Sequence, residues 1–350
     1  MSHKKFIILT PGFPGSETDT TCLPMQQQFT KALKETHPEL DIIVVAFQYP
    51  YHQKRYRWFD IDVIPFGGEN KGGLKRLLLR KKIKTVLREI QETSEIVGLL
   101  SFWYNECAVI GKMLADDYGI KHYCWILGQD ARKENKYPKR IPLRENELIA
   151  LSGFLQQEFE KNHGIKPGFV ITPGVDDKLF HVSPKKNIDI LGTGSLIPLK
   201  QYDIFLEVLA EVKKQVTELN AVLIGEGSEL ERLKIIVKKL NLGSNVTLTG
   251  ELPYPEVLRY MEKAKIFLHP SSYEGFSGVC LEALHSGCQV LSFCKPMNED
   301  IPHWQIVKTK DEMAEKTLAI LQNSKTEYKN INKFPINDTV AAIMKLYEKN

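Results

Sequence analysis

The sequence predicts an α/β protein built from parallel sheets and divided into two domains of similar size. Short apolar runs alternate with helix-like segments along the chain, a pattern typical of buried parallel strands joined by crossover helices. The length of 350 residues exceeds what one hydrophobic core ordinarily serves. Hydrophobic residues make up 43% of the chain and no segment is of low complexity, so we expect order throughout.

The first half contains the apolar runs of one sheet. Residues 5–10 form the first expected strand, followed by a turn containing Gly12 and Gly15 and by a helix over residues 23–33. Further strands are expected at residues 42–47, 96–102, 123–127 and 147–152.

Residues 71–88 carry eight basic side chains and no acidic one, interleaved with leucine, isoleucine and valine. This pattern predicts a basic amphipathic helix. Two interpretations are open. The lysines are merely solvated on a surface helix, or the helix contacts an anionic membrane or a lipid-linked, phosphate-bearing acceptor.

In the second half, residues 266–268 read as a buried strand and residues 279–286 as a helix that Gly287 ends at its C′ position. The next strand is expected at residues 289–293. We place the first domain at residues 1–173 and the second at residues 188–330. A linker is expected over residues 174–187, where proline, glycine, serine and lysine cluster.

Two glutamates, Glu274 and Glu282, flank the start of the 279–286 helix. A fully helical segment between them would span roughly 12 Å, comparable to a sugar, a diphosphate and a ribose in a row. Backbone N–H groups of residues 276–278 would attract the phosphates at the helix start. Glu274 would then face the sugar and Glu282 the ribose hydroxyls. The alternative is a solvated pair of glutamates beside a βα turn.

These residues carry a family resemblance. The segment from Glu274 to Gly287 resembles the Glu-x7-Glu signature of retaining glycosyltransferases with the GT-B fold, the glycosyl transferases group 1 family. Seven positions of the pattern match: Glu274, Gly275, Phe276, Leu281, Glu282, Ala283 and Gly287. Ser277 stands where the family usually has glycine, next to Gly278.

Other segments resemble the same family. Lys200 falls on its diphosphate-binding lysine, whereas Ser195 stands where the family has an arginine. By the resemblance, the donor site includes Gly194, Ser195, Gly225, Gly250, Glu251 and Leu252 together with Glu282, Gly275, Phe276, Ser277 and Gly278. In the first domain, Gly12 and Gly15 lie where the family has its glycine loop for the acceptor or phosphate. Asp130 lies where the family touches the transferred sugar, unless it caps the next helix.

The resemblance implies two facing Rossmann-like domains, with residues 331–350 forming a helix that crosses back to the first. It implies transfer of a hexose from a UDP-sugar or GDP-sugar to a hydroxyl of a glycan or lipid-linked acceptor, with retention at the anomeric carbon. Glu274, Lys200 and Asp130 are the expected catalytic residues, without a metal or other cofactor. An epimerase or a non-catalytic nucleotide-sugar-binding protein of the same fold is the alternative, and Ser195 keeps the latter open.

Several classes are disfavoured. Gly192 and Gly194 lack the third glycine of a nicotinamide fingerprint, since Ile197 stands there, and no P-loop pattern occurs. A net charge of +4 gives no reason to expect nucleic-acid binding. Six cysteines without Cys-x2-Cys spacing suggest reduced thiols in a cytoplasmic protein. If residues 71–88 contact a membrane, the protein is expected to be peripheral on its inner face. The histidines show no metal-ligand spacing.

Overall fold

The computed structural model describes residues 4–181, 185–295, 297 and 299–348. By their contacts the residues form two compact units, which are described separately here. Unit 1 contains residues 1–174 and 336–350, and unit 2 contains residues 175–335. The predicted α/β class with two parallel-sheet domains is confirmed.

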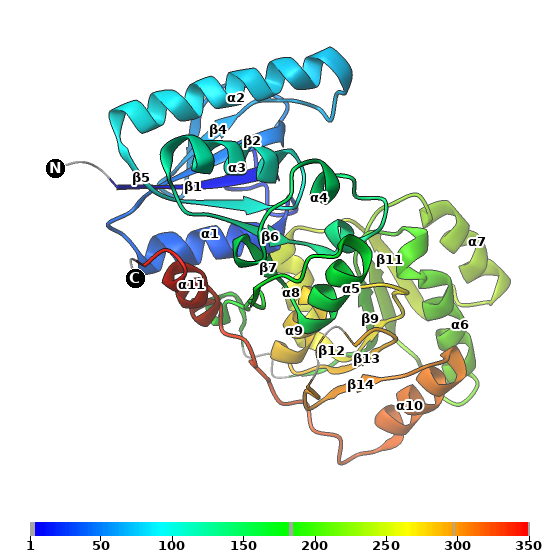
Figure 1. Cartoon of the computed structure of the whole chain (residues 1–350). Coiled ribbons are helices and arrows are strands. Elements are labelled where there is room, and N and C mark those ends of the chain that lie inside the picture. Colours follow the sequence, from blue (N-terminus) through cyan, green and yellow to red (C-terminus); the bar gives the residue numbers. More distant parts are fainter. Residues whose placement is uncertain (1–3, 182–184, 296, 298, 349–350) are drawn as a thin grey trace. The chain divides into compact units, whose positions relative to one another are not determined.

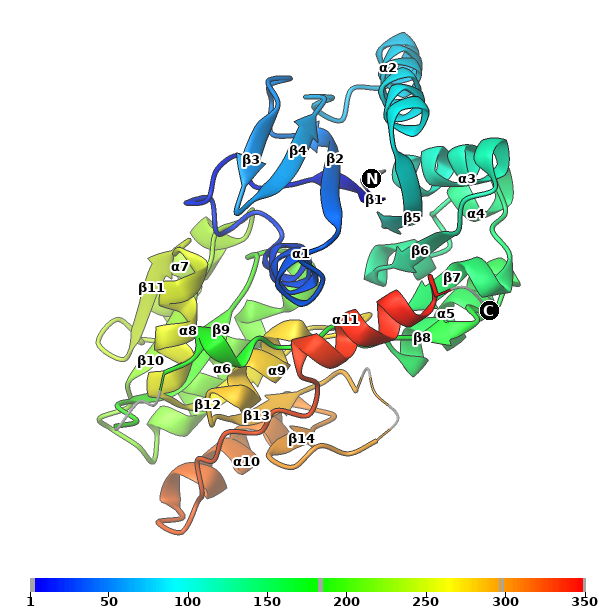
Figure 2. The same cartoon turned by 90° about the vertical axis from the view of Figure 1, so that its left-hand side faces the viewer.

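Unit 1 contains an eight-stranded sheet in the order β3-β4-β2-β1-β5-β6-β7-β8, with β1 inside it (Figure 2). All neighbouring strands are parallel except β3, which pairs antiparallel with β4. The strands are β1 Lys4–Gly12, β2 Asp41–Tyr49, β3 Tyr56–Trp58, β4 Ile61–Pro65, β5 Glu95–Phe102, β6 His122–Ile126, β7 Leu148–Ala150 and β8 Phe169–Val170. The chain leaves β1 toward β2 and later returns to add β5 on the other side, so the strand order reverses at β1.

Helices cover both faces of this sheet. On one face α2 packs against α3, and on the other α1 lies beside α11 (Figures 1 and 2). The helical segments are α1 Pro24–Thr36, α2 Gly73–Thr93, α3 Glu106–Tyr118, α4 Tyr137–Arg140, α5 Gly153–His163 and α11 Ile336–Lys345, with short 3₁₀ turns η1 Gly128–Ala131 and η2 Glu145–Glu147. Ile83, Leu87 and Ile90 turn one side of α2 into the core, where they join strand residues such as Ile43 and Leu99.

The last residues are tied to unit 1 by an aromatic side chain. The hydroxyl of Tyr347 donates to the carbonyl of Leu99 at 2.7 Å. Its ring packs edge-on against Phe6 and Tyr123, with centroid distances of 4.9 and 5.0 Å. These contacts join the segment after α11 to strands β1, β5 and β6.

Unit 2 contains a fully parallel six-stranded sheet in the order β11-β10-β9-β12-β13-β14. Its strands are β9 Ile188–Thr193, β10 Ala221–Ile224, β11 Val246–Gly250, β12 Ala264–His269, β13 Gln289–Ser292 and β14 Trp304–Ile306. The order reverses between β9 and β12, which are neighbours in the sheet. In open α/β sheets, ligands bind outside the carboxyl ends of the strands at such a switch point.

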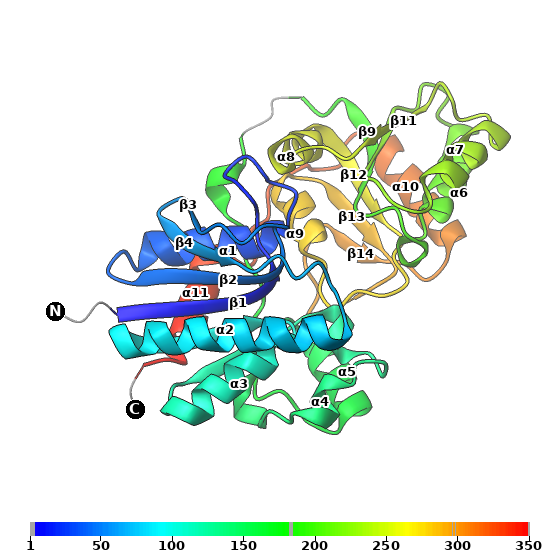
Figure 3. The same cartoon turned by 90° about the horizontal axis from the view of Figure 1, so that it is seen from above.

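Figure 3 shows α6, α7 and α10 on one side of this sheet and α8 with α9 on the other. These helices are α6 Tyr202–Lys213, α7 Leu230–Lys239, α8 Tyr254–Lys263, α9 Gly278–His285 and α10 Lys310–Gln322, with 3₁₀ turns η3 Asp177–Leu179 and η4 Pro198–Lys200. The core between α6, α10 and the sheet is aliphatic and aromatic, with Phe205, Leu209 and Met313 fully buried.

Residues 175–187, most of the expected linker, group with unit 2, although residues 182–184 lie outside the described residues. The backbone N–H of His181 donates to Glu262, and Lys186 Nζ donates to the carbonyl of Ser286 at 2.6 Å. Helix α9 begins at Gly278, one residue before the predicted helix, and Gly287 follows it with a positive φ of 77°. None of the described helices is both long and apolar enough to span a membrane.

Candidate active site

The loops that follow β9, β10 and β11 are joined by backbone hydrogen bonds at the carboxyl edge of the unit 2 sheet. Gly194 N–H donates to the Ile224 carbonyl at 3.1 Å, and Gly225 N–H donates to the Gly250 carbonyl at 2.9 Å. Leu196 N–H donates to the Glu226 carbonyl at 2.8 Å. The predicted donor-site residues Gly194, Gly225 and Gly250 therefore lie within one connected group of loops.

Glycine is required at position 225 for a steric reason. Gly225 has φ of +143°, which side chains rarely adopt, and a Cβ there would clash with the carbonyl oxygen of Gly194. Gly227, at φ +156°, would similarly clash with the Leu196 carbonyl. The two glycines let the loop after β10 lie against the loop after β9.

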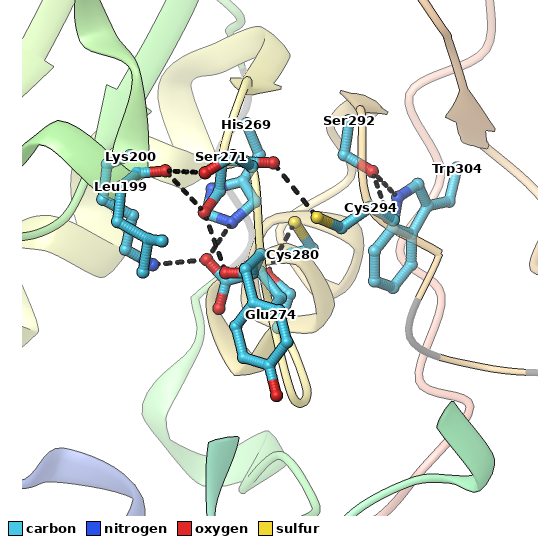
Figure 4. A network of polar contacts seen from close by, with 12 residues as sticks. Leu199, Lys200, His269, Ser271, Glu274, Cys280, Ser292, Cys294 and Trp304 are labelled. Atoms are coloured by element: carbon cyan, nitrogen blue, oxygen red, sulfur yellow. Dashed lines mark hydrogen bonds and ion pairs between the residues drawn. The ribbon is translucent and has the colours of Figure 1, made fainter. Parts of the chain in front are cut away.

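Glu274 lies at the switch point of the sheet, in the loop between β12 and α9. Lys200 Nζ, at the end of η4, is 2.5 Å from Glu274 Oε1, and His269 Nε2 is 2.8 Å from the same oxygen. Figure 4 shows the ammonium and the imidazole both directed at this carboxylate. The structure thus brings together two of the predicted catalytic residues, Lys200 and Glu274.

The electrostatics of this cluster favour an ionised Glu274. Burial would raise the pKa of this carboxyl, but hydrogen bonding by His269 and the positive charge of Lys200 outweigh it and lower the pKa to about 2. Burial lowers the pKa of His269, whose side chain is only 1% exposed. A neutral imidazole protonated at Nε2 can therefore donate to Glu274.

Serine and cysteine side chains hold the loops of Lys200 and Glu274 together. The Leu199 carbonyl accepts hydrogen bonds from Ser272 N–H at 3.0 Å and from Ser271 Oγ at 3.3 Å. Cys294 Sγ donates to the Ser271 carbonyl at 3.0 Å (Figure 4). Strands β9 and β12 are neighbours in the sheet, so the loops that follow them start side by side. The contacts hold the loop that contains Lys200 against the loop that contains Glu274.

The start of α9 lies directly after Glu274 and has no side-chain cap. Ser277, at the N-cap position, instead donates its hydroxyl to Cys280 Sγ at 3.0 Å. Phe276 and Ser277 are buried, and Gly278 is the first residue of the helix. A helix start of this kind presents backbone N–H groups and a partial positive charge to an anion.

Glu282 lies on α9 and contacts α8 rather than the Lys200 cluster. Tyr254 donates its hydroxyl to Glu282 Oε1 at 2.8 Å. Burial raises the pKa of Glu282 to about 7, although the hydrogen bond from Tyr254 opposes this shift. The two glutamates of the motif are therefore electrostatically different: Glu274 is firmly ionised, and Glu282 titrates near neutral pH.

The other residues predicted for the donor site occupy the same edge. Ser195 is exposed in the loop after β9. Glu251 is exposed and Leu252 is half-buried in the loop between β11 and α8. Gly250, at φ +77°, ends β11 beside the carboxylate of Glu226.

In unit 1, Gly12 ends β1 and Gly15 N–H donates to Asp19 Oδ2 at 3.0 Å. Asp130 is buried in η1, and its Oδ2 accepts a hydrogen bond from Leu127 N–H at 2.8 Å. Burial raises the pKa of Asp130 to about 7. Its carboxyl group therefore closes η1 from within the turn. The next helix, α4, has Lys136 rather than Asp130 at its N-cap position, and a role of Asp130 toward the sugar stays a prediction.

A polar cavity of about 200 Å³ lies where the unit 1 sheet reverses its strand order. Its walls include Pro11 near the end of β1, and Asn105 and Glu106 after β5. Glu106 is held by Arg80 and by the Tyr137 hydroxyl at 2.6 Å, while Arg76 lies farther away at 3.8 Å. Arg80 neutralises Glu106 directly, so Arg76 contributes a surplus positive charge to this cavity.

Comparison with protein families assigns the carboxyl-terminal unit. Residues 176–334 match the family described as glycosyl transferases group 1. The match covers nearly all of unit 2, which belongs to this family.

Proteins similar to this chain include an uncharacterised glycosyltransferase of Methanocaldococcus jannaschii, 25% identical over 240 residues. The match covers 67% of this chain and 65% of the archaeal protein. A second relative is the N-acetylgalactosamine-N,N'-diacetylbacillosaminyl-diphospho-undecaprenol 4-alpha-N-acetylgalactosaminyltransferase of Campylobacter jejuni, 36% identical over 104 residues. That match covers 29% of this chain and 27% of the relative, so the chain spans less than two thirds of either protein.

The fold of the chain is GT-B. The structure of Anabaena HepE in complex with UDP-glucose has a TM-score of 0.72 and 18% sequence identity. The similarity covers 97% of this chain and 99% of HepE, so it includes both units.

The predicted site residues do not include His269 and Tyr254, which contact Glu274 and Glu282. The histidines show no metal-ligand spacing, so the sequence does not single out His269. Its position as the last residue of β12, at the carboxyl edge of the sheet, was the signal available. Tyr254 could not be found this way, because its contact depends on the packing of α8 against α9.

Proposed function

We propose that this protein transfers a hexose from a UDP-sugar or GDP-sugar to a hydroxyl of a glycan or lipid-linked acceptor, with retention at the anomeric carbon. The observation that carries the proposal is the convergence of Glu274, Lys200 and the uncapped start of α9 at the switch point of the unit 2 sheet. A carboxylate, a cation and helix N–H groups are the partners that a sugar and a diphosphate require.

Each part of the donor has a proposed partner. Glu282, oriented by Tyr254, accepts hydrogen bonds from the ribose hydroxyls. The start of α9 and Lys200 bind the diphosphate. Glu274 accepts hydrogen bonds from hydroxyls of the sugar through Oε2. Its other carboxylate oxygen, Oε1, already contacts both Lys200 and His269.

Lys200 has two roles: it pairs with Glu274 and it binds the diphosphate. In the structure its ammonium pairs with Glu274. In the donor complex the same ammonium also faces the diphosphate and stabilises the charge that develops on the leaving group. His269 keeps Glu274 hydrogen-bonded while Lys200 is shared between the two anions. Ser195 offers only a hydroxyl at the position where the family pattern that this segment resembles has an arginine.

The reaction needs no protein base in this scheme. The departing phosphate oxygen takes the proton from the acceptor hydroxyl on the same face of the sugar, so the C–O bond to the acceptor forms as the C–O bond to phosphate breaks. The new bond keeps the original anomeric configuration. The protein contributes orientation and electrostatic stabilisation without a required metal.

For the acceptor, we propose the polar cavity of unit 1 between Pro11, Asn105 and Arg76. It lies at the carboxyl ends of β1 and β5, where an open α/β sheet binds ligands. Arg76 suits a phosphate or diphosphate on the acceptor. The C. jejuni relative, whose name describes a diphospho-undecaprenol-linked sugar, supports a lipid-linked acceptor.

A thermal-shift screen of nucleoside diphosphates and their sugars tests the donor, because a bound ligand stabilises the folded state by mass action. The donor found this way is then incubated with candidate acceptors, and products are followed by mass spectrometry. The expected product is the acceptor plus one hexose, absent with the Glu274→Gln variant. An isomerised nucleotide-sugar formed without acceptor would instead indicate an epimerase, and tight binding without turnover over a broad acceptor set would indicate a binding protein.

A further inference from the structure

Helix α2 buries only part of its apolar surface. Ile83, Leu87 and Ile90 face the core, but three leucines nearer its start are exposed by 72%, 58% and 53% of their area: Leu74, Leu77 and Leu78. Clustered exposed leucines on one turn and a half of a helix are unfavourable in water unless something covers them. Lysines lie next to these leucines, so a partner that covers the leucines must also suit the positive charge.

A groove runs along the same helix. Its volume is about 710 Å³, and apolar atoms of Phe66, Leu79 and Val86 contribute to its walls. Five basic side chains also line it: Arg55, Lys71, Lys75, Lys81 and Lys82. No carboxylate is among its lining residues in the described part of the chain.

The charges of this groove are largely unneutralised. Lys71 pairs with Glu69 at 2.7 Å, whereas Arg55, Lys75, Lys81 and Lys82 form no ion pair among the described residues. Arg80 differs from them, because it is held by Glu106. The groove is therefore suited to a ligand with a negative head and an apolar body.

We propose that the α2 surface, defined as Leu74, Leu77, Leu78 and the five basic residues of the groove, docks on an anionic phospholipid bilayer. The leucines enter the boundary between head groups and acyl chains, and a lipid phosphate occupies the basic groove. Charge complementarity selects this partner over an apolar protein surface, since lysines surround the leucines and anionic lipids supply the opposite charge. The inference goes beyond the transfer reaction, because docking requires neither donor nor acceptor.

Vesicle co-sedimentation of the full chain tests the proposal. Vesicles of phosphatidylcholine alone are compared with vesicles containing phosphatidylglycerol, each at low and high salt. We expect binding to the anionic vesicles only, weakened by salt as the Debye length shortens. Two variants should each lose at least about tenfold in binding: Lys75→Glu/Lys81→Glu/Lys82→Glu and Leu74→Ser/Leu77→Ser/Leu78→Ser.

The matched control is Lys234→Glu/Lys238→Glu/Lys239→Glu on α7. It makes the same change in net charge beside another exposed apolar residue, Ile235, and should bind vesicles within about twofold of wild type. An equal loss in this control would attribute binding to net charge and overturn the proposal. Circular dichroism melting curves check that each variant is folded.

Other outcomes would also overturn it. If the wild-type protein does not co-sediment with anionic vesicles at low salt, the α2 surface does not dock on a bilayer. A dimer that becomes monomeric in the leucine variant would assign the leucines to a second copy of this chain. The Glu274→Gln variant should sediment with vesicles like wild type, so failure of the transfer reaction and failure of docking remain distinguishable.

Discussion

Donor binding should depend on pH through Glu282. Its pKa of about 7, raised by burial, means that about half of the carboxyl groups are protonated at pH 7 in the free protein. Ribose hydroxyls donate to the carboxylate, so donor binding favours the ionised form. Affinity should then fall as pH falls, by about tenfold between pH 8 and pH 6, because the ionised fraction falls from about nine tenths to about one tenth.

The assay is isothermal titration calorimetry with a nucleotide-sugar, whose diphosphate has no group titrating in this range. At pH 7, binding should release about half a proton, measured by repeating the titration in buffers of different ionisation enthalpy. The Glu282→Gln variant should release almost none and lose the pH dependence. The Glu282→Ala variant should bind more weakly by about 1.5 to 3 kcal/mol, the usual value of a charge-assisted hydrogen bond.

Wild-type affinity that stays constant from pH 6 to pH 8, without proton release, would refute the assignment of Glu282 to the ribose. Asp130, with a similar pKa of about 7, lies in the other unit. An Asp130→Asn variant with unchanged proton release excludes it as the source.

Three further predictions concern the same edge of unit 2. Glu274→Ala should abolish turnover and keep binding of the nucleoside diphosphate, because Glu274 faces only the sugar; calorimetry showing lost diphosphate binding would contradict this. Lys200→Ala should lose affinity for the nucleoside diphosphate far more than for the nucleoside, since only the former carries charge, and equal losses would mean that the lysine acts through structure. Gly225→Ala should lower the free energy of unfolding of unit 2 by about 1 to 3 kcal/mol, measured by urea titration. The control for the last is Gly243→Ala, whose Cβ would meet open space, and equal effects would exclude the proposed clash with Gly194.

Much of the fold could be predicted because parallel strands are buried on both faces. The apolar runs at residues 42–47 and 266–268 therefore stand out, and both lie in observed strands. Short edge strands lack this signal: β3 Tyr56–Trp58 and β14 Trp304–Ile306 have three residues each and were missed. Helix α2 extends to Thr93, past the end of the basic run at Arg88 that defined its prediction.

The resemblance predicted site residues far apart in the sequence, but the contacts between them could not be predicted from sequence patterns. Glu274 and Glu282 share one motif, but the contact of Lys200 with Glu274 joins residues 74 positions apart. That contact depends on the pairing of β9 with β12, which sequence patterns do not specify. The partner of Arg80 was missed for the same reason, since Glu106 lies on α3 and meets α2 only through packing.

The measurement that most directly tests the central claim is proton NMR of a transfer reaction started with an α-linked nucleotide-sugar. We expect the first product formed to show the α-anomeric signal and coupling constant of a retained configuration, and no such signal to form with Glu274→Gln. A β-linked product from the wild-type protein, or equal turnover by the variant, would contradict it.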